Sequence, residues 1–301
     1  MPTFASICIL FLFLMKEDIE VKEIDQVVVR FSGDSGDGMQ LAGNIFSTVS
    51  ANVGNGISTF PDYPADIRAP QGSLTGVSGF QVHIGRGRVY TPGDKCDVLV
   101  AMNAAALKTQ YKYAKLNATI IIDTDCFGPK DLEKAGFQSY DFLGEMGIDS
   151  DRVVAYPISK LVKECLADSG MDNKAMLKCR NMFALGMVCW LFNRDLDLVA
   201  GFLNEKFARK PLVAANNIKV VRAGYDCGHN VHASVPSTYR IESKVKDPGR
   251  YMDITGNKAT AYGLIAAAER AGLKLYLGSY PITPATDILH ELAKHKSLGV
   301  I

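Results

Sequence analysis

A loop rich in glycine and aspartate, which could bind an anion through its backbone, lies near the start of the sequence in RFSGDSGDGMQLAG, residues 30–43. Glycine lets backbone N–H groups come close to a ligand. The loop separates an apolar run from a helical pattern, so the N–H groups of Gly38, Met39 and Gln40 would lie at a helix N-terminus, where the helix dipole favours negative charge. The residues predicted to bind a phosphate are Gly33, Asp34, Ser35, Gly36, Asp37 and Gly38.

A second interpretation of this loop is a self-capped structural turn. The spacing G-x-x-G-x-G is neither G-x-G-x-x-G nor G-x-x-x-x-G-K-[ST], so no standard nucleotide fingerprint applies. Asp37 could cap the helix itself and occupy the place of a ligand. A calcium loop is excluded because the D-x-[DN]-x-[DN]-G order is absent. The ligand loop and the self-capped turn both stay open.

Two other polar residues stand where ligands bind in proteins. Arg68 lies between proline-stiffened segments in FPDYPADIRAPQGSLTGVSGFQVH, residues 60–83, and its guanidinium could bind a phosphate or carboxylate through two hydrogen bonds. An ion pair with Asp66 or Asp62 is the alternative. Asn103 ends a predicted strand and precedes a helix, a position where α/β sheets place ligands. Its alternative role is a plain N-cap.

The cysteines and the net charge exclude several classes of protein. None of the seven cysteines forms a C-x-x-C pair, which disfavours an iron–sulfur cluster or a zinc ribbon in this chain and suits a reducing cytoplasm. Cys227, His229 and His232 in CGHNVH could converge on one ion, but a fourth ligand is not evident, so we assign no metal site. The net charge of +1 provides no electrostatic footprint for nucleic acid or an anionic membrane.

The N-terminus carries an apolar run over residues 7–15, which is too short to span a bilayer because a spanning helix needs roughly 20 residues. We interpret residues 1–14 as an over-extended reading frame and expect a natural start at Met15.

The elements that position these residues alternate between strands and helices. Short β-branched runs predict strands at 26–31, 79–85, 97–103, 118–123 and 152–158. Apolar residues at three- and four-residue spacing predict a helix over 39–53, and further helices follow Asn103 and Ser159. This alternation predicts an α/β fold with a mixed, partly parallel sheet between helices.

The second half of the chain is mostly helical, with helices expected at 177–191 and 196–207. Residues 234–257 are polar, contain two prolines and show no sustained period, which is typical of a linker. Beyond them we predict a helix at 257–272, a strand at 273–278 and a helix at 284–296. The predicted organisation is an extension at 1–23, a first domain at 24–232, a linker at 233–252 and an incomplete α/β domain at 253–301.

Three segments together resemble one protein family. VVVRFSGDSGDGMQLAG, FPDYPADIRAPQGSLTGVSGFQVHIG and TPGDKCDVLVAMNAAALK resemble the γ domain of 2-oxoacid:ferredoxin oxidoreductases, in the form that fuses γ and α in one chain. GNKATAYGLIAAAERAG and YPITPATDILHEL resemble the start of the α pyrimidine-binding domain. The resemblance covers about Val27 to Ile301. Ala104 departs from the proline that often follows the asparagine in this family.

The resemblance implies oxidative decarboxylation of a 2-oxoacid, with 2-oxoglutarate favoured, to an acyl-CoA with electrons passed to ferredoxin. Thiamine diphosphate would be shared with a β subunit, and Mg²⁺ and the [4Fe-4S] clusters would belong to that partner. Coenzyme A would be the co-substrate, received by the γ domain at the glycine loop, Arg68 and Asn103. The competing classes are a non-catalytic CoA- or nucleotide-binding module and a nicotinamide dehydrogenase, which the missing G-x-G-x-x-G disfavours.

The resemblance also assigns a substrate-side motif to YPITP, residues 280–284. Tyr280, Pro281, Ile282 and Thr283 would bind the substrate, and Thr283 would act near the thiazolium and the oxoacid carboxylate. A hydroxyl between two prolines is held rigidly and can stabilise a developing oxyanion. The alternative is that Thr283 only caps the following helix. The glutamate that activates the cofactor in this family is expected beyond Ile301, so this chain alone is expected to be inactive.

Overall fold

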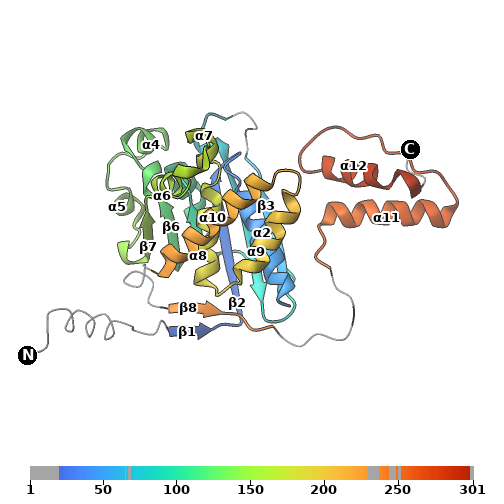
Figure 1. Ribbon diagram of the computed structural model, residues 1–301, viewed down its shortest axis with the longest axis horizontal. Helices are drawn as coiled ribbons and strands as arrows, with labels where there is room; N and C mark the ends of the chain where they lie inside the picture. The colour runs from blue at the N-terminus through green and yellow to red at the C-terminus, as the bar shows by residue number, and fades with distance from the viewer. Residues whose placement is uncertain are drawn as a thin grey trace, which may run out of the picture. The chain divides into compact units, whose positions relative to one another are not determined.

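The computed structural model describes residues 20–64, 66, 69–229, 237–243, 249 and 252–298. Arg68, His232 and the apolar run of residues 7–15 therefore lie outside the described residues, and so does the whole of the predicted over-extension. The chain divides between Lys246 and Asp247 into two compact units (Figure 1).

The first unit is built on a six-stranded sheet with the strand order β3-β4-β2-β5-β6-β7. β2, β5, β6 and β7 run parallel to one another, whereas β4 is antiparallel to both β2 and β3. The strands are β2 (Gln26–Asp34), β3 (Gly56–Asp62), β4 (Val77–Gly85), β5 (Cys96–Ala101), β6 (Ala114–Asp123) and β7 (Val153–Tyr156). The predicted mixed, partly parallel sheet is confirmed, and β3 is a strand that we did not predict.

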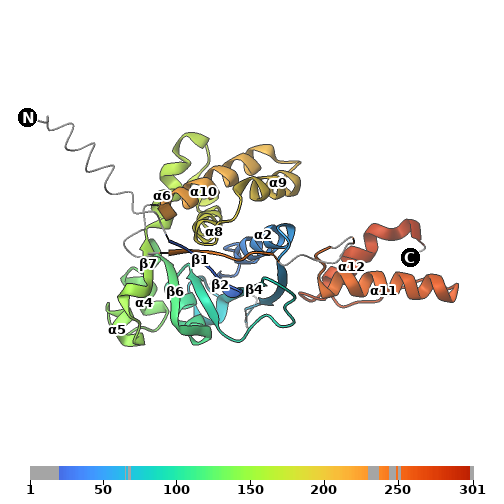
Figure 2. The same ribbon diagram turned by 90° about the horizontal axis from the view of Figure 1, so that it is seen from below.

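Helices cover both faces of this sheet (Figure 2). One face carries α2 (Met39–Asn52), α6 (Ile158–Cys165), α7 (Asn173–Leu177), α8 (Arg180–Leu191), α9 (Leu196–Lys206) and α10 (Pro211–His229). The other carries α3 (Ala104–Gln110), α4 (Pro129–Lys134) and α5 (Phe142–Met146). Short 3-10 turns connect these elements, namely η1 (Leu74–Gly76), η2 (Tyr111–Tyr113), η3 (Thr124–Cys126), η4 (Ser150–Arg152) and η5 (Ala167–Ser169).

Each face of the sheet has its own hydrophobic core. Because strand side chains alternate between the faces, Val27, Val29 and Phe31 of β2 pack with α2 and α8, while Val28 joins the core on the other face. α8 is buried along its whole length from Asn181 to Leu191, which explains its nearly continuous apolar sequence.

A two-stranded parallel sheet joins the beginning of the first unit to its end. β1 (Glu20–Glu23) pairs with β8 (Ser237–Arg240), although residues 233–252 were predicted to be a linker. Ser237, Thr238 and Ile241 are buried, and the Asn55 side-chain amide donates to the Ile241 carbonyl at 3.2 Å. A polar stretch without periodicity is therefore partly a strand, because pairing and burial are provided by residues far away in the sequence.

The second unit contains two helices, α11 (Gly256–Ala271) and α12 (Thr286–Leu292), followed by the turn η6 (Ala293–Leu298). Thr255 caps α11 and Gly272 ends it in the left-handed conformation, which confirms the helix predicted at 257–272. Residues 273–278 do not form the predicted strand. Only Leu275 of this segment forms an isolated β-bridge, and Leu275 and Leu277 pack against the small core of Ala261, Ile265 and Leu292.

Within the described residues, none of the helices combines the length and the apolar character needed to cross a bilayer.

Candidate functional site

The carboxyl ends of the parallel strands bring several polar residues to one edge of the sheet. β2 ends at Asp34, β5 leads into Asn103 and β6 ends at Asp123, while Ser159 is the second residue of α6, the helix that follows β7. Parallel strands end at the same edge, and open α/β sheets bind ligands there. The first unit thus places the predicted glycine loop where a ligand site is expected.

The glycine loop adopts the backbone conformation that only glycine takes easily. Gly36 has φ 102° and Gly38 has φ 78°. Gly38 is the N-cap of α2, and no side chain caps this helix. The N–H groups of Met39 and Gln40 therefore lie at an uncapped helix N-terminus, as predicted.

Asp37 does not cap α2, so the self-capped turn is wrong. Its Oδ2 atom accepts a hydrogen bond from the Asp34 backbone N–H at 3.1 Å, and its Oδ1 atom accepts from Nη2 of Arg180 at 2.9 Å. Both carboxylate oxygens of Asp37 thus accept hydrogen bonds from groups outside α2. The reason is that the Arg180 guanidinium forms a charge-assisted hydrogen bond with Oδ1 while the Asp34 N–H occupies Oδ2.

Asp34 lies beside a small polar cavity at the same loop. The cavity has a volume of about 80 Å³ and is lined by Asp34, Ser35, Asp66, Ala69, Pro70, Gln71 and Gly76. Oδ2 of Asp34 accepts from the Gly72 N–H at 2.8 Å, whereas Oδ1 is buried without a partner among the described residues. Burial raises the pKa of Asp34 above its ordinary value, and the hydrogen bond from Gly72 opposes this shift.

Asn103 is the N-cap of α3. Its side-chain oxygen accepts a hydrogen bond from the Ala106 N–H at 2.8 Å, so the capping alternative is confirmed. A side-chain hydrogen bond from Asn103 to the Asp34 carboxyl also lowers the pKa of Asp34, as one of the lesser influences on it. A ligand role for Asn103 stays a prediction, and it would have to use the side-chain NH₂ group.

Arg180 connects the glycine loop to the ends of β6 and β7, and the sequence did not reveal this. Its Nη1 atom lies 2.9 Å from Sγ of Cys126, 3.4 Å from Oγ of Ser159 and 3.8 Å from Oδ2 of Asp123. Residues 173–246 were the least distinctive part of the sequence. The signal that could have indicated the cluster is Asp123, an acidic residue at the end of an otherwise apolar strand.

Asp123 is completely buried at the centre of this cluster. Oδ2 accepts from the Ser159 hydroxyl at 2.6 Å, and Oδ1 accepts from the Ser159 backbone N–H at 3.2 Å. Burial raises the pKa of Asp123, and the hydrogen bonds from Ser159 oppose the shift. Burial likewise raises the pKa of Cys126 to about 12, so this thiol stays protonated near neutral pH and is a poor nucleophile.

Arg68 lies outside the described residues, which leaves its predicted role as a prediction. Asp62, one of the two carboxylates considered as its partner, forms an ion pair with Arg30. Arg30 is 2% exposed and also contacts Gln110 and Gln81 at 2.7 Å and 3.0 Å. Asp62 is therefore the ion-pair partner of the buried Arg30.

The substrate-side motif lies in the second unit, where Tyr280, Pro281, Ile282 and Thr283 are all exposed. Thr283 does not cap α12, because the N-cap is Ala285 and no side chain makes a capping hydrogen bond there. The carbonyl oxygen of Ile282 instead accepts from the Thr286 N–H and hydroxyl, both at 3.0 Å. The capping alternative for Thr283 is therefore wrong, and its hydroxyl makes no capping hydrogen bond to the described residues of α12.

Within the described ranges, no cluster of three or more histidine, cysteine or acidic side chains could hold a metal ion. Cys227 and His229 both belong to α10, and their third suggested partner, His232, is outside these ranges.

A mixed α/β sheet with a glycine loop and an uncapped helix N-terminus at its carboxyl edge places the chain in the class of open-sheet α/β proteins, which typically bind ligands at that edge. Comparison with known proteins narrows this class. Residues 28–227 match the family "Pyruvate ferredoxin/flavodoxin oxidoreductase", and the chain belongs to this family. The resemblance predicted from the sequence is confirmed.

Two curated relatives are similar over most of this chain. The chain is 44% identical over 281 residues to "2-oxoglutarate oxidoreductase subunit KorA" of Mycobacterium tuberculosis, covering 93% of this chain and 43% of the relative. It is 21% identical over 288 residues to "2-oxoacid:ferredoxin oxidoreductase 1, subunit alpha" of Aeropyrum pernix, covering 87% of this chain and 42% of that protein. The chain thus spans less than half the length of these relatives.

A solved structure has the same fold. The 2-oxoglutarate:ferredoxin oxidoreductase from Magnetococcus marinus, solved with 2-oxoglutarate, coenzyme A and succinyl-CoA bound, matches with a TM-score of 0.67 and 25% identity. The match covers 92% of this chain and 43% of that one.

Proposed function

We propose that this chain forms part of a 2-oxoacid:ferredoxin oxidoreductase that converts 2-oxoglutarate and coenzyme A to succinyl-CoA and CO₂, with the electrons passed to ferredoxin. The observation that carries the proposal is the 44% identity, over 281 residues, to a 2-oxoglutarate oxidoreductase subunit. The bound ligands of the Magnetococcus marinus structure support the same substrate and co-substrate. The proposed location of this reaction is the cytoplasm, which agrees with the free cysteines of the described residues, three of them buried and three partly buried.

The glycine loop is the proposed site for coenzyme A. The N–H groups of the first turn of α2 would hold a phosphate, since the helix has no side-chain cap. Oδ1 of Asp34, which is buried without a partner among the described residues, would accept from an amide N–H of the pantetheine arm. Arg68 and Asn103 remain proposed contributors. These residues fit an elongated ligand that carries both phosphate and amide groups.

Thr283 is the proposed catalytic residue in the second unit. Thiamine diphosphate, which we propose is shared with the β subunit, would supply the nucleophile for the oxoacid carbonyl and the electron sink for decarboxylation. The Thr283 hydroxyl would donate to the oxoacid carboxylate or to the developing oxygen charge. Tyr280, Pro281 and Ile282 of the same motif would bind the substrate. Mg²⁺ and the [4Fe-4S] clusters would reside in the β subunit, and this chain would act together with that partner.

The test is 2-oxoacid-dependent reduction of ferredoxin by the full-length protein assembled with its β subunit. We expect reduction that needs both coenzyme A and 2-oxoglutarate, with pyruvate and branched-chain oxoacids used at least tenfold less efficiently. Coenzyme A binding without any reduction would identify a non-catalytic binding module instead. A preference for pyruvate would overturn the proposed substrate.

In the same assay Thr283→Val removes the hydroxyl while keeping the side-chain shape, and we expect kcat/KM to fall by about 10²-fold, as for one lost oxyanion donor. Thr286→Val is the matched control, because the Thr286 hydroxyl already donates to the Ile282 carbonyl within the helix. A loss below about threefold in Thr283→Val would reject the catalytic role.

A further inference from the structure

The first two residues of α8 hold the two residues that precede α2. Arg180 donates from Nη2 to Oδ1 of Asp37 at 2.9 Å, and the Asn181 side-chain amide donates to the Gly38 carbonyl at 3.0 Å. A Cβ atom on Gly38 would lie 2.4 Å from the Asn181 amide nitrogen, so the loop and α8 are in close contact. The start of α2 is therefore positioned by a helix that begins more than a hundred residues later in the chain.

The position of Asp37 calls for an explanation. A carboxylate next to a helix N-terminus is drawn to the orphan N–H groups and to the positive end of the dipole. Asp37 stands directly before the N-cap Gly38, yet α2 has no side-chain cap. The contact with Arg180 removes the carboxylate from the place where a ligand anion would bind.

Arg180 is well anchored for this task. Its side chain is 15% exposed, and its Nη1 atom contacts Cys126 and Ser159, at 2.9 Å and 3.4 Å. Asp123, which is completely buried, lies 3.8 Å from the same nitrogen. The guanidinium is thus held between the end of β6 and the beginning of α6, and it cannot follow Asp37 toward α2.

We infer that Arg180 is a positioning residue that withholds the Asp37 carboxylate from the N-terminus of α2 and so keeps the first-turn N–H groups available to an anionic group of the ligand. Independent support for a ligand at this loop comes from Asp34, which lines the small polar cavity beside the loop. A hydrogen bond from Asn103 reaches its carboxyl group, yet the buried Oδ1 atom has no well-formed hydrogen bond among the described residues. The inference rests on the proposed function in taking that ligand to be coenzyme A.

The test is coenzyme A binding, measured by calorimetry on the assembled enzyme without 2-oxoacid. Arg180→Met frees Asp37 to cap α2 or to repel the incoming phosphate, and we expect the Kd to rise about tenfold or more, because juxtaposed like charges are strongly unfavourable. Arg180→Met combined with Asp37→Asn removes the repelling charge, and we expect its Kd to return to within about threefold of wild type. In turnover, Arg180→Met should raise KM for coenzyme A while kcat at saturating coenzyme A is largely retained.

The matched control is Arg194→Lys, because Arg194 is also buried and follows the opposite end of α8. Its Kd should equal that of the wild type. An unchanged Kd in Arg180→Met, or a double variant that binds no better than Arg180→Met, would overturn the inference and indicate a purely structural arginine. Absence of coenzyme A binding by the wild type would overturn it too. If the Kd values are as expected but the enzyme shows no 2-oxoglutarate-dependent ferredoxin reduction, the proposed function is overturned and the role of Arg180 stands.

Discussion

Asp34, at the residue scale, combines a stability cost with the binding role proposed for it. Its Oδ1 atom is buried and unpaired within the described residues, and burial raises its pKa. Between its ordinary pKa and the raised one, the folded protein holds a proton that the unfolded chain has lost. Stability therefore falls as the pH rises through that window, and the full cost of the buried charge is present above it.

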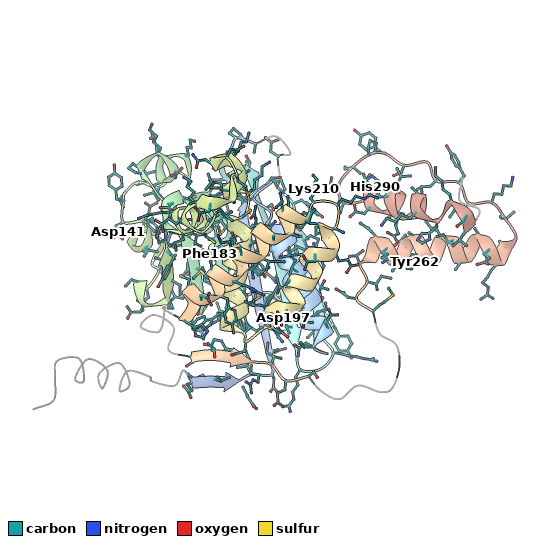
Figure 3. All side chains as sticks on the ribbon, in the orientation of Figure 1. Asp141, Phe183, Asp197, Lys210, Tyr262 and His290 are labelled. Carbon is teal, nitrogen blue, oxygen red and sulfur yellow. The ribbon has the colours of Figure 1, made fainter. Side chains whose placement is uncertain are left out.

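Asp34→Asn should remove this cost while its side-chain oxygen still accepts from Gly72. We expect the variant to melt about 2–4 °C above wild type at pH 8, corresponding to about 1 kcal/mol, and the difference to shrink toward zero at pH 4. Thermal unfolding followed by circular dichroism between these pH values measures it. Asp141→Asn is the control, because Asp141 is an exposed N-cap of α5 and asparagine caps equally well (Figure 3). A difference that does not depend on pH would show that Asp34 carries no such cost.

At the scale of elements, the site depends on where α8 lies, and two glycines set its crossing with α10. A Cβ atom on Gly224 of α10 would lie 2.1 Å from the Phe183 carbonyl oxygen of α8, and one on Gly186 of α8 would lie 2.1 Å from the Val221 carbonyl oxygen. Phe183 is labelled in Figure 3, within the layer of helices on this face. Because backbone atoms cannot rotate aside, a side chain here would force the helices apart and displace the N-terminus of α8.

Gly224→Ala should therefore destabilise the protein by about 3 kcal/mol, at the upper end for overpacking. Gly201→Ala in α9 provides the matched control, because its Cβ atom would meet nothing within 4 Å. Alanine there should stabilise by roughly 0.5–1 kcal/mol through its higher helix propensity. Urea unfolding of both variants measures the two effects. Equal effects in the two variants would refute the close-packing explanation.

At the scale of the whole molecule, the chain forms two compact units that separate between Lys246 and Asp247. The first unit extends through β8 and the buried Ile241, beyond the first-domain boundary predicted at residue 232. Pairing with β1 binds the end of this unit to its beginning. The boundaries of the linker and of the second domain stay predictions.

Limited trypsin digestion should consequently cut first at Lys244, Lys246 or Arg250, because these residues adjoin the division between the units. Arg240 is the internal control, since its exposed side chain belongs to β8 and its backbone is paired with β1. Mass spectrometry of the earliest fragments identifies the site. First cleavage at Arg240, or within residues 60–120, would contradict this boundary.

The sequence by itself determined the elements whose patterns are local. The apolar runs predicted five strands of the main sheet, the glycine loop predicted the start of α2 after Gly38, and the position of Asn103 predicted an N-cap. Its motifs also carried the family resemblance. These features could be predicted because strand burial, helix periodicity and capping depend on residues within one or two turns.

Only the tertiary structure decided which partners the polar residues take. Asp37 could cap α2 on local grounds, yet it binds Arg180, 143 residues away in the sequence. β8 could not be predicted from a polar segment, because its strand exists only through pairing with β1. The physical reason is that ion pairs and sheet ladders depend on which surfaces packing brings together. Packing holds the Arg180 guanidinium with Ser159, Cys126 and Asp123, beside the Asp37 carboxylate.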